Sequence, residues 1–338
     1  MQTPHALGFR MPAEWEPHEA TWIAWPHNRE DWPGRFAPIP WVYGEIVRKL
    51  ARVERVRILA EDADHRESAR RVLKKIGADL DAVEFFIQPT DRVWTRDYGP
   101  IFVRKRGHVA ITNWRFNGWA KYDNWKKDDA VTAQIARRLK MRAWQPGLVL
   151  EGGSIDVNGR GLLLTTEECL LSPVQARNPG LGRRDIERAL GDYLGARRVI
   201  WLRNGIAGDD THGHIDDLAR FVAPNTVVIA AEADKSDANY EPLRENLRLL
   251  RAQPLRVVRL PMPRPLIFNG QRLPASYANF YIANKLVLAP TFNDPNDRMA
   301  LATLARLFPD REVAGIHATE LIWGLGTLHC LTQQQPAA

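Results

Sequence analysis

Short apolar runs alternate with amphipathic segments along nearly the whole chain. Apolar residues recur at helical spacing in six segments, which predict helices at residues 43–54, 66–76, 128–140, 183–193, 240–252 and 297–308. Between them lie β-branched or apolar runs of strand length, at residues 21–25, 56–60, 101–103, 108–112, 199–202, 218–222, 227–231, 280–283 and 286–290. Asp128 and Asp129 are expected to open the third helix. The alternation predicts an α/β protein.

The predicted strands fall into a loose repeat of polar loop, strand, tight turn, strand and helix. Four units begin near residues 94, 150, 210 and 275. A fifth would pair the C-terminal segment 327–334 with the N-terminal segment 19–26, because neither has a hairpin partner nearby. The starts of successive units are roughly 50–70 residues apart, and repeats of that length usually indicate stacked or radially arranged modules. No linker separates the units, so residues 1–338 are expected to form a single domain, although an ordinary mixed sheet with chance similarity between units is the alternative.

The polar residues of chemical interest precede the first strand of a unit. In a radial assembly this shared placement would bring them together at one end of the molecule. The repeat therefore predicts an active site there.

Overall charge does not change this picture. Hydrophobic residues make up 45% of the chain and charged residues 26%, as in a globular protein with an ample core. The net charge of +7 raises the question of nucleic-acid binding. The basic residues, however, are dispersed in predicted helices such as 66–75 and 136–142, which favours solvated helix faces. No nucleic-acid partner is expected.

Nothing in the pattern predicts export or membrane insertion. The longest apolar runs, such as 227–231 and 286–290, are far shorter than a membrane span, and the N-terminal segment lacks the parts of a signal peptide. The two cysteines, Cys169 and Cys330, form no disulfide framework. A cytoplasmic protein without a membrane partner is expected.

Two motifs place a carboxylate next to glycine. In Trp94–Pro100, Asp97 precedes a Gly-Pro pair, and a salt bridge to Arg96 or a turn cap is the purely structural interpretation. Glu151 precedes two glycines, which let the backbone approach a ligand closely but also suit a plain turn. Each motif alone is a weak indication of function.

Residues 208–217 carry the densest set of ionisable side chains, with four carboxylates and two imidazoles. Such groups are costly to bury for structure alone. If the segment is extended, His214 and Asp216 point to one face as an acid/base and a carboxylate. Alternatively, Thr211–Asp217 resembles the T-H-x-H-x-D-H zinc signature of metallo-β-lactamase-like hydrolases, with His212 as one ligand, but Asp217 replaces its last histidine.

The C-terminal motif, residues 324–334, contains Cys330 after two spaced glycines and a histidine. A lone cysteine is more often a small buried apolar residue than a nucleophile. Glycines before the thiol would admit a substrate, however, and the polar residues 332–334 are unusual for a core strand. Cys169 has no such neighbours and is expected to be structural.

Together these motifs resemble the agmatine deiminase family, within the guanidine-modifying superfamily that includes arginine deiminases and bacterial peptidylarginine deiminases. The resemblance extends over nearly the whole chain, through the ordered motifs MPAEWEPHE (11–19), WTRDYGP (94–100), FNGW (116–119), KKDD (126–129), LEGGS (150–154), TTEECLL (165–171), DTHGHIDD (210–217), SYANFYIAN (276–284) and HCLTQQ (329–334). It implies a five-module pseudo-symmetric α/β propeller, the pentein fold, in agreement with the repeat.

The resemblance also implies roles for five catalytic residues. Cys330 would be the nucleophile and His214 the general acid/base. Asp97 and Asp216 would hold the guanidinium nitrogens, and Glu151 would be the acidic partner of the histidine.

Substrate binding is implied less completely. Trp94 would line the channel, and Asp210 stands where the family tends to place an acid near the distal amine. The family often has G-G-G-N where this chain has residues 324–327, ending in Thr327, and T-D-G-H where it has His212 as the second residue. Both departures concern the distal pocket and not the chemistry.

Deimination explains why these residue types occur together. A guanidinium is planar and permanently cationic, so carboxylates orient it while a thiolate attacks its carbon. The expected reaction converts agmatine to N-carbamoylputrescine and ammonia, a step of putrescine biosynthesis that requires no metal or other cofactor. Free arginine and peptidyl-arginine are the alternative substrates, and a zinc-dependent hydrolase is the alternative enzyme. The expected partner is a small guanidinium cation, and a homo-oligomer is compatible with the sequence.

Overall fold

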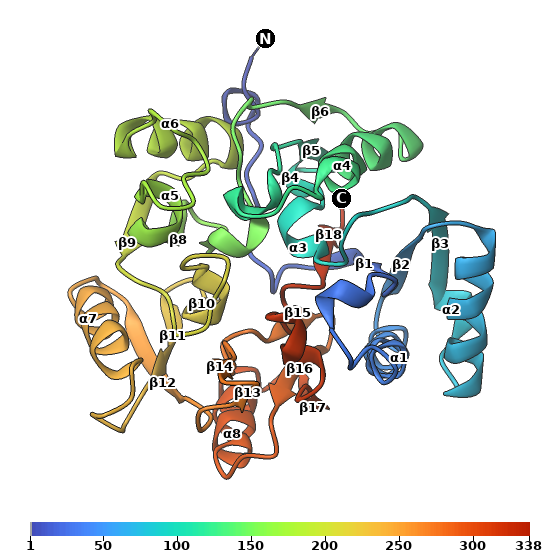
Figure 1. Cartoon of the computed structure of the whole chain (residues 1–338). Coiled ribbons are helices and arrows are strands. Elements are labelled where there is room, and N and C mark those ends of the chain that lie inside the picture. The colour runs from blue at the N-terminus through green and yellow to red at the C-terminus, as the bar shows by residue number, and fades with distance from the viewer. Residues whose placement is uncertain (1) are drawn as a thin grey trace.

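The computed structural model describes residues 2–338 and contains mixed sheets surrounded by helices. The helices are α1 (Ile39–Leu50), α2 (Ala63–Lys75), α3 (Thr95–Tyr98), α4 (Lys126–Arg138), α5 (Glu167–Leu171), α6 (Arg183–Leu194), α7 (Tyr240–Arg251) and α8 (Asp297–Leu307). Figure 1 shows the sheets arranged around a common centre, with the long helices on the outside. The chain is therefore an α/β protein, as predicted.

Five sheets share one plan, in which a strand pairs antiparallel with one neighbour and parallel with the other. Four of them are β4 (Ile101–Lys105), β5 (His108–Thr112), β6 (Ala143–Trp144); β7 (Asp156–Val157), β8 (Leu162–Thr166), β9 (Arg198–Leu202); β10 (Ala219–Ala223), β11 (Thr226–Ala231), β12 (Arg256–Pro261); and β15 (Tyr281–Ala283), β16 (Leu286–Thr291), β17 (Glu312–His317). A separate hairpin joins β13 (Ile267–Phe268) to β14 (Gln271–Arg272). The antiparallel pairs need only tight turns, whereas each parallel pair requires a crossover, which the helices provide.

The fifth sheet joins the two ends of the chain. It has the order β18 (Gln333–Pro336), β1 (His18–Ala24), β2 (Arg55–Ala60) and β3 (Val83–Ile87). Strands β1 and β18 are antiparallel, with Thr21 opposite Gln334. The predicted pairing of the terminal segments is confirmed.

The predicted helices and strands are present, with boundaries shifted by a few residues. The outer parallel strands β3, β12 and β17 escaped prediction because exposed and half-buried residues interrupt their apolar pattern. The two short helices α3 and α5 replace segments that were read as loops.

The acidic residues of α4 do not open that helix, which starts two residues earlier than predicted. Asp128 instead accepts hydrogen bonds from the backbone N–H groups of Asp91 and Arg92, and Asp129 accepts one from that of Phe116. The two aspartates therefore hold the neighbouring loops that contain residues 91–92 and 116. None of the helices in residues 2–338 has the length and apolar character required to span a bilayer.

Candidate active site

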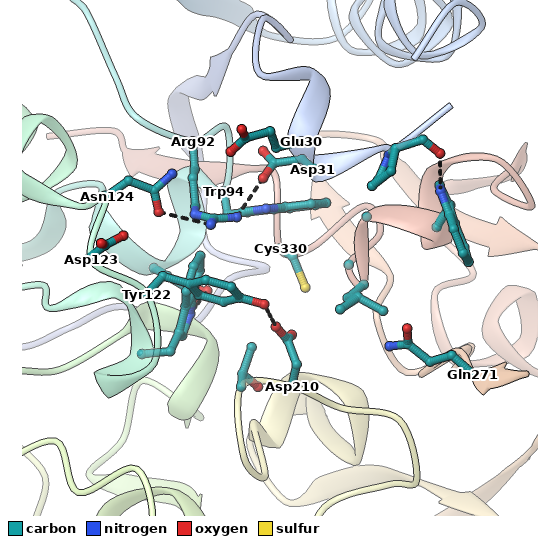
Figure 2. Close-up of a pocket in the computed structure, with 18 residues that line it drawn as sticks. Glu30, Asp31, Arg92, Trp94, Tyr122, Asp123, Asn124, Asp210, Gln271 and Cys330 are labelled. Atoms are coloured by element: carbon teal, nitrogen blue, oxygen red, sulfur yellow. Dashed lines mark hydrogen bonds and ion pairs between the residues drawn. The ribbon is translucent and has the colours of Figure 1, made fainter. Parts of the chain in front are cut away.

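The loops that precede the first strands of several sheets surround one cavity of about 450 Å³. Figure 2 shows the Cys330 thiol pointing into this cavity. The lining combines carboxylates with aromatic rings: Glu30, Asp31, Asp97, Asp123, Asp210, Trp94, Trp119, Tyr122 and Trp323. Its arginine, Arg92, is ion-paired with Asp31 at 2.6 Å. The cavity is therefore suited to a cation with an apolar body.

Cys330 is held by the side chain of Asn279. The Asn279 Nδ2 donates to the Cys330 Sγ at 3.0 Å and to Asp217 at 3.0 Å, while its Oδ1 accepts from Thr327 Oγ1 at 2.7 Å. Burial raises the pKa of the Cys330 thiol well above its usual value, and Asp216, Asp217 and Asp97 raise it further. These surroundings favour the thiol form of Cys330, whereas a bound cation would oppose the carboxylates and favour the thiolate.

Asp97 occupies α3 at the base of the cavity. Its two oxygens accept hydrogen bonds from Trp119 Nε1 at 2.9 Å and from the Gly153 N–H at 3.0 Å. Burial raises the pKa of Asp97 to about 7, against the opposing effect of His214. The expected alternative of an Asp97–Arg96 salt bridge is wrong, because Arg96 points towards the C-terminal strand and donates to Gln334 at 2.7 Å.

His214 is set by a loop organised around Asp209, whose Oδ2 accepts from the N–H groups of Gly213 at 2.8 Å and His214 at 3.1 Å. The imidazole lies among three carboxylates. Its Nδ1 is 3.8 Å from Asp97 and 4.0 Å from Asp216, and its Nε2 is 3.9 Å from Glu151. Burial alone would lower its pKa, but Asp97, Cys169 and Glu151 raise it well above the usual value. These carboxylates therefore favour the imidazolium form of His214.

Glu151 forms a fully buried ion pair with Arg177, whose Nε donates to Oε1 at 2.9 Å. Burial tends to raise the pKa of Glu151, yet Arg177 and His214 lower it to about 2. The carboxylate is thus ionised, and its second oxygen, Oε2, faces His214.

Asp216 links Cys330 to a buried polar network. One oxygen lies 3.7 Å from the Cys330 Sγ and 2.7 Å from His329 Nδ1, and the other, Oδ1, has no hydrogen-bond partner in residues 2–338. The second nitrogen of His329 lies 2.8 Å from Glu14, which in turn accepts from Arg220 at 2.8 Å. Burial would raise the pKa of Asp216, but His329 lowers it. The unpartnered oxygen is available to a donor in the site.

Of the predicted substrate-binding residues, Trp94, Asp97 and Asp210 lie in the lining, whereas Asp216 is buried beside the Cys330 thiol. The Trp94 ring packs on Trp32, with ring centroids 5.5 Å apart, and against Gly326, where a Cβ would lie 2.7 Å from the indole. Asp210 accepts from Tyr122 Oη at 2.6 Å, as Figure 2 shows. The lining thus joins an aromatic ring to an acid, Asp210, whose carboxylate also lies 3.4 Å from Lys121 Nζ.

The alternative zinc signature is not assembled. The His212 Nε2 lies 3.1 Å from the hydroxyl of Ser172, and its Nδ1 is 3.9 Å from Glu168. Within residues 2–338, the donor sets close enough to hold a metal are Glu151–Cys169–His214 and Asp216–Asp217–Cys330, and neither includes His212. The zinc-hydrolase alternative therefore loses its ligand set.

Cys169 differs from its predicted surroundings. It is buried, as expected of a structural residue, but its thiol lies beside Glu151 and His214. Sequence reasoning also missed the supporting residues Asn279, Arg177, His329 and Trp119. Asn279 precedes the first strand of its unit, so the placement rule that selected the carboxylates would have found it.

Comparisons with known proteins agree with this geometry. A sequence profile of Porphyromonas-type peptidyl-arginine deiminases matches residues 10–336. An agmatine deiminase of Pseudomonas aeruginosa (strain LESB58) is 40% identical over 368 aligned residues, which cover 99% of this chain and 97% of that protein. The solved agmatine deiminase of Enterococcus faecalis has a TM-score of 0.92 at 31% identity, covering 99% of this chain and 98% of that one. A C. jejuni agmatine deiminase with substrate bound has a TM-score of 0.90 at 32% identity, covering 97% and 96%.

Proposed function

Because the chain belongs to the Porphyromonas-type peptidyl-arginine deiminase family, we propose that it hydrolyses the guanidinium group of agmatine to N-carbamoylputrescine and ammonia. The observation that carries the proposal is the buried thiol of Cys330 in a cavity lined by carboxylates and aromatic rings. A permanent cation fits such a lining, and an activated thiol is the nucleophile that its carbon requires.

Two carboxylates would orient the substrate. Asp97 and Asp216 flank the thiol, so a planar guanidinium between them would donate N–H bonds to both and present its carbon to the sulfur. The bound positive charge would lower the pKa of Asp97 and of Cys330 together. Substrate binding would thereby ionise the groups that act on it.

In the first half-reaction, the Cys330 thiolate bonds to the guanidinium carbon and forms a tetrahedral adduct. The imidazolium of His214 gives a proton to one nitrogen, the C–N bond breaks, and ammonia leaves. The remaining carbon is held as a thiouronium on the sulfur.

In the second half-reaction, neutral His214 takes a proton from water, which attacks the same carbon. The C–S bond then breaks, the new hydroxyl group gives its proton to the departing sulfur, and the thiol is restored with a product that carries a urea group. Ionised Glu151, held by Arg177, would stabilise the imidazolium each time a proton returns to His214.

Agmatine is favoured over arginine because the outer part of the cavity is acidic. Asp210, Glu30 and Asp123 lie in the lining, while the guanidinium of Arg92 is already paired with Asp31. An ammonium group at the far end of the substrate is attracted there, whereas a carboxylate is repelled. Free arginine and peptidyl-arginine remain the alternative substrates.

We further propose that residues 1–338 form one domain, a five-module pseudo-symmetric propeller, because five sheets repeat one topology around a common centre. Both cysteines are free thiols, which supports a cytoplasmic location. A small guanidinium cation is the proposed partner, with no role for nucleic acid or membrane.

The test is turnover of agmatine, arginine and a peptidyl-arginine by the purified protein, followed through ammonia release. We expect agmatine to have the highest kcat/KM, and equal turnover of arginine would remove the agmatine assignment. Mass spectrometry of acid-quenched enzyme with agmatine should show a substrate adduct on the peptide that contains Cys330.

A further inference from the structure

Residues 165–169, at the end of β8 and the start of α5, contact the loops that carry Glu151 and His214. Thr165 Oγ1 donates to the carbonyl of Ser154 at 2.8 Å, in the Glu151 loop. Thr166 Oγ1 donates to the carbonyl of Gly213 at 2.6 Å, one residue before His214. One short segment thus holds both loops in place.

The two nitrogens of His214 have different surroundings. Nδ1 is 3.8 Å from Asp97 and 4.0 Å from Asp216, the two carboxylates proposed to hold the guanidinium, so this edge of the ring lies on the side of the proposed substrate. Nε2 faces Glu151 Oε2 at 3.9 Å. A direct N–H···O hydrogen bond requires about 2.7–3.2 Å. The histidine and its acidic partner are therefore close but not bonded.

This gap leaves polar atoms unsatisfied. Both His214 Nε2 and Glu151 Oε2 are buried and have no hydrogen-bond partner in the part of the chain that the structure describes. Buried polar groups without partners are rare in folded proteins and indicate a missing or unconventional partner.

The thiol of Cys169 is the candidate for that partner. Its sulfur, a ring nitrogen of His214 and a carboxylate oxygen of Glu151 all lie within 4.8 Å of one another. The Cys169 backbone N–H donates to Thr166 Oγ1 at 3.0 Å, which fixes the residue in the first turn of α5. A thiol can accept an N–H and donate its S–H at the same time, and sulfur reaches farther than oxygen.

We propose that Cys169 is a positioning residue whose thiol bridges the pair, accepting the Nε2–H of His214 and donating its S–H to Glu151 Oε2. The inference rests on the proposed function, in which His214 gives and takes protons. The bridge would keep one proton on Nε2 throughout the cycle, so that only Nδ1 exchanges protons with the substrate side. No bond is made to the Cys169 sulfur, and it is unchanged by the reaction.

The decisive variant is Cys169→Ala, which removes the bridge and leaves a small apolar side chain. We expect kcat for agmatine to fall about tenfold with KM changed by less than about twofold, since the substrate contacts are intact and a hydrogen bond to a charged group is lost. Cys169→Ser should recover part of kcat, because a hydroxyl keeps both hydrogen-bonding functions but has a shorter reach.

A second readout does not depend on activity. NMR titration of labelled histidine in the substrate-free protein, with His214→Gln for assignment, should show the His214 pKa lower by about one unit in Cys169→Ala, the equivalent of tenfold in proton affinity. Leu170→Ala is the matched control, because it truncates the next side chain of α5, in an apolar cluster. It should reduce stability without moving the His214 titration.

The outcomes separate the two hypotheses. An unchanged His214 titration in Cys169→Ala, with kcat reduced no more than in Leu170→Ala, would overturn the bridge and leave Cys169 a packing residue. A lowered His214 pKa in a protein that does not turn over agmatine would support the bridge while rejecting the proposed function.

Discussion

The buried ion pair between Glu151 and Arg177 gives a prediction whose size follows from the structure. Both side chains are completely buried, and Arg177 also donates to the carbonyl oxygens of Gln175 and Thr211. Arg177→Met removes the cation while keeping the length of the side chain. Breaking a buried pair leaves an uncompensated charge and costs about 3–5 kcal/mol.

That cost converts into a measurable shift in melting temperature. An unfolding entropy of about 2.1 cal/mol/K per residue, over 338 residues, makes 3–5 kcal/mol equivalent to about 4–7 °C. Activity should fall as well, by about a hundredfold, because Glu151 would take up a proton and no longer stabilise the His214 imidazolium. Differential scanning fluorimetry and ammonia release measure the two effects.

The matched control is Arg183→Met. Arg183 pairs with Glu167 on the surface, where its side chain is 43% exposed, and such pairs contribute less than about 1 kcal/mol. The double variant Glu151→Gln with Arg177→Met should regain stability but not activity. If Arg177→Met melts within a degree of Arg183→Met, the buried pair does not stabilise the protein as reasoned here.

Four further predictions concern the reaction itself. Cys330→Ala should abolish turnover while leaving the circular dichroism spectrum intact, and residual activity above about one part in a thousand would assign the nucleophile elsewhere. For Asp97, whose pKa is raised to about 7, kcat/KM for agmatine should rise with pH through about 7, because the protonated acid below that pH cannot hold the guanidinium; a flat profile between pH 5.5 and 8.5 would contradict this. Trp119→Phe removes a hydrogen bond to the carboxylate of Asp97, so the rise of kcat/KM should shift to higher pH. An unshifted rise would show that Trp119 does not lower the pKa of Asp97. Asp210→Asn should raise KM for agmatine about three- to tenfold with little change in kcat, whereas an equal fall in kcat would place Asp210 in the chemistry.

Much of the fold was predictable because its central strands are uniformly apolar. Strands β11 and β16 are buried along nearly their whole length, so their sequences read as strands without any knowledge of the partner. The edge strands β12 and β17 carry several exposed residues without a regular alternation, and only their pairing with the central strand makes them strands.

The site residues also fall into two groups, those that the sequence revealed and those that it did not. Cys330, His214 and Asp97 were visible because each precedes the first strand of a unit, and the structure brings those positions together around one cavity or directly beside it. Arg177 was not visible, because its partner is 26 residues away and nothing in the local sequence distinguishes a buried arginine from a surface one. The neighbours of Cys169 were not visible either, because Glu151 and His214 belong to other loops that pack against it.

The pairing of β1 with β18 also has a consequence for the order of folding. The Arg96 N–H, next to Asp97, donates a hydrogen bond to the carbonyl of Cys330 at 3.1 Å. Asp97 and Cys330 are therefore correctly placed relative to each other only after β1 and β18 have paired. Contacts between such distant segments form late, since a very long loop must close before they can stabilise anything. During refolding, the helical circular dichroism signal should therefore return first. Enzyme activity should return later, when β1 and β18 pair.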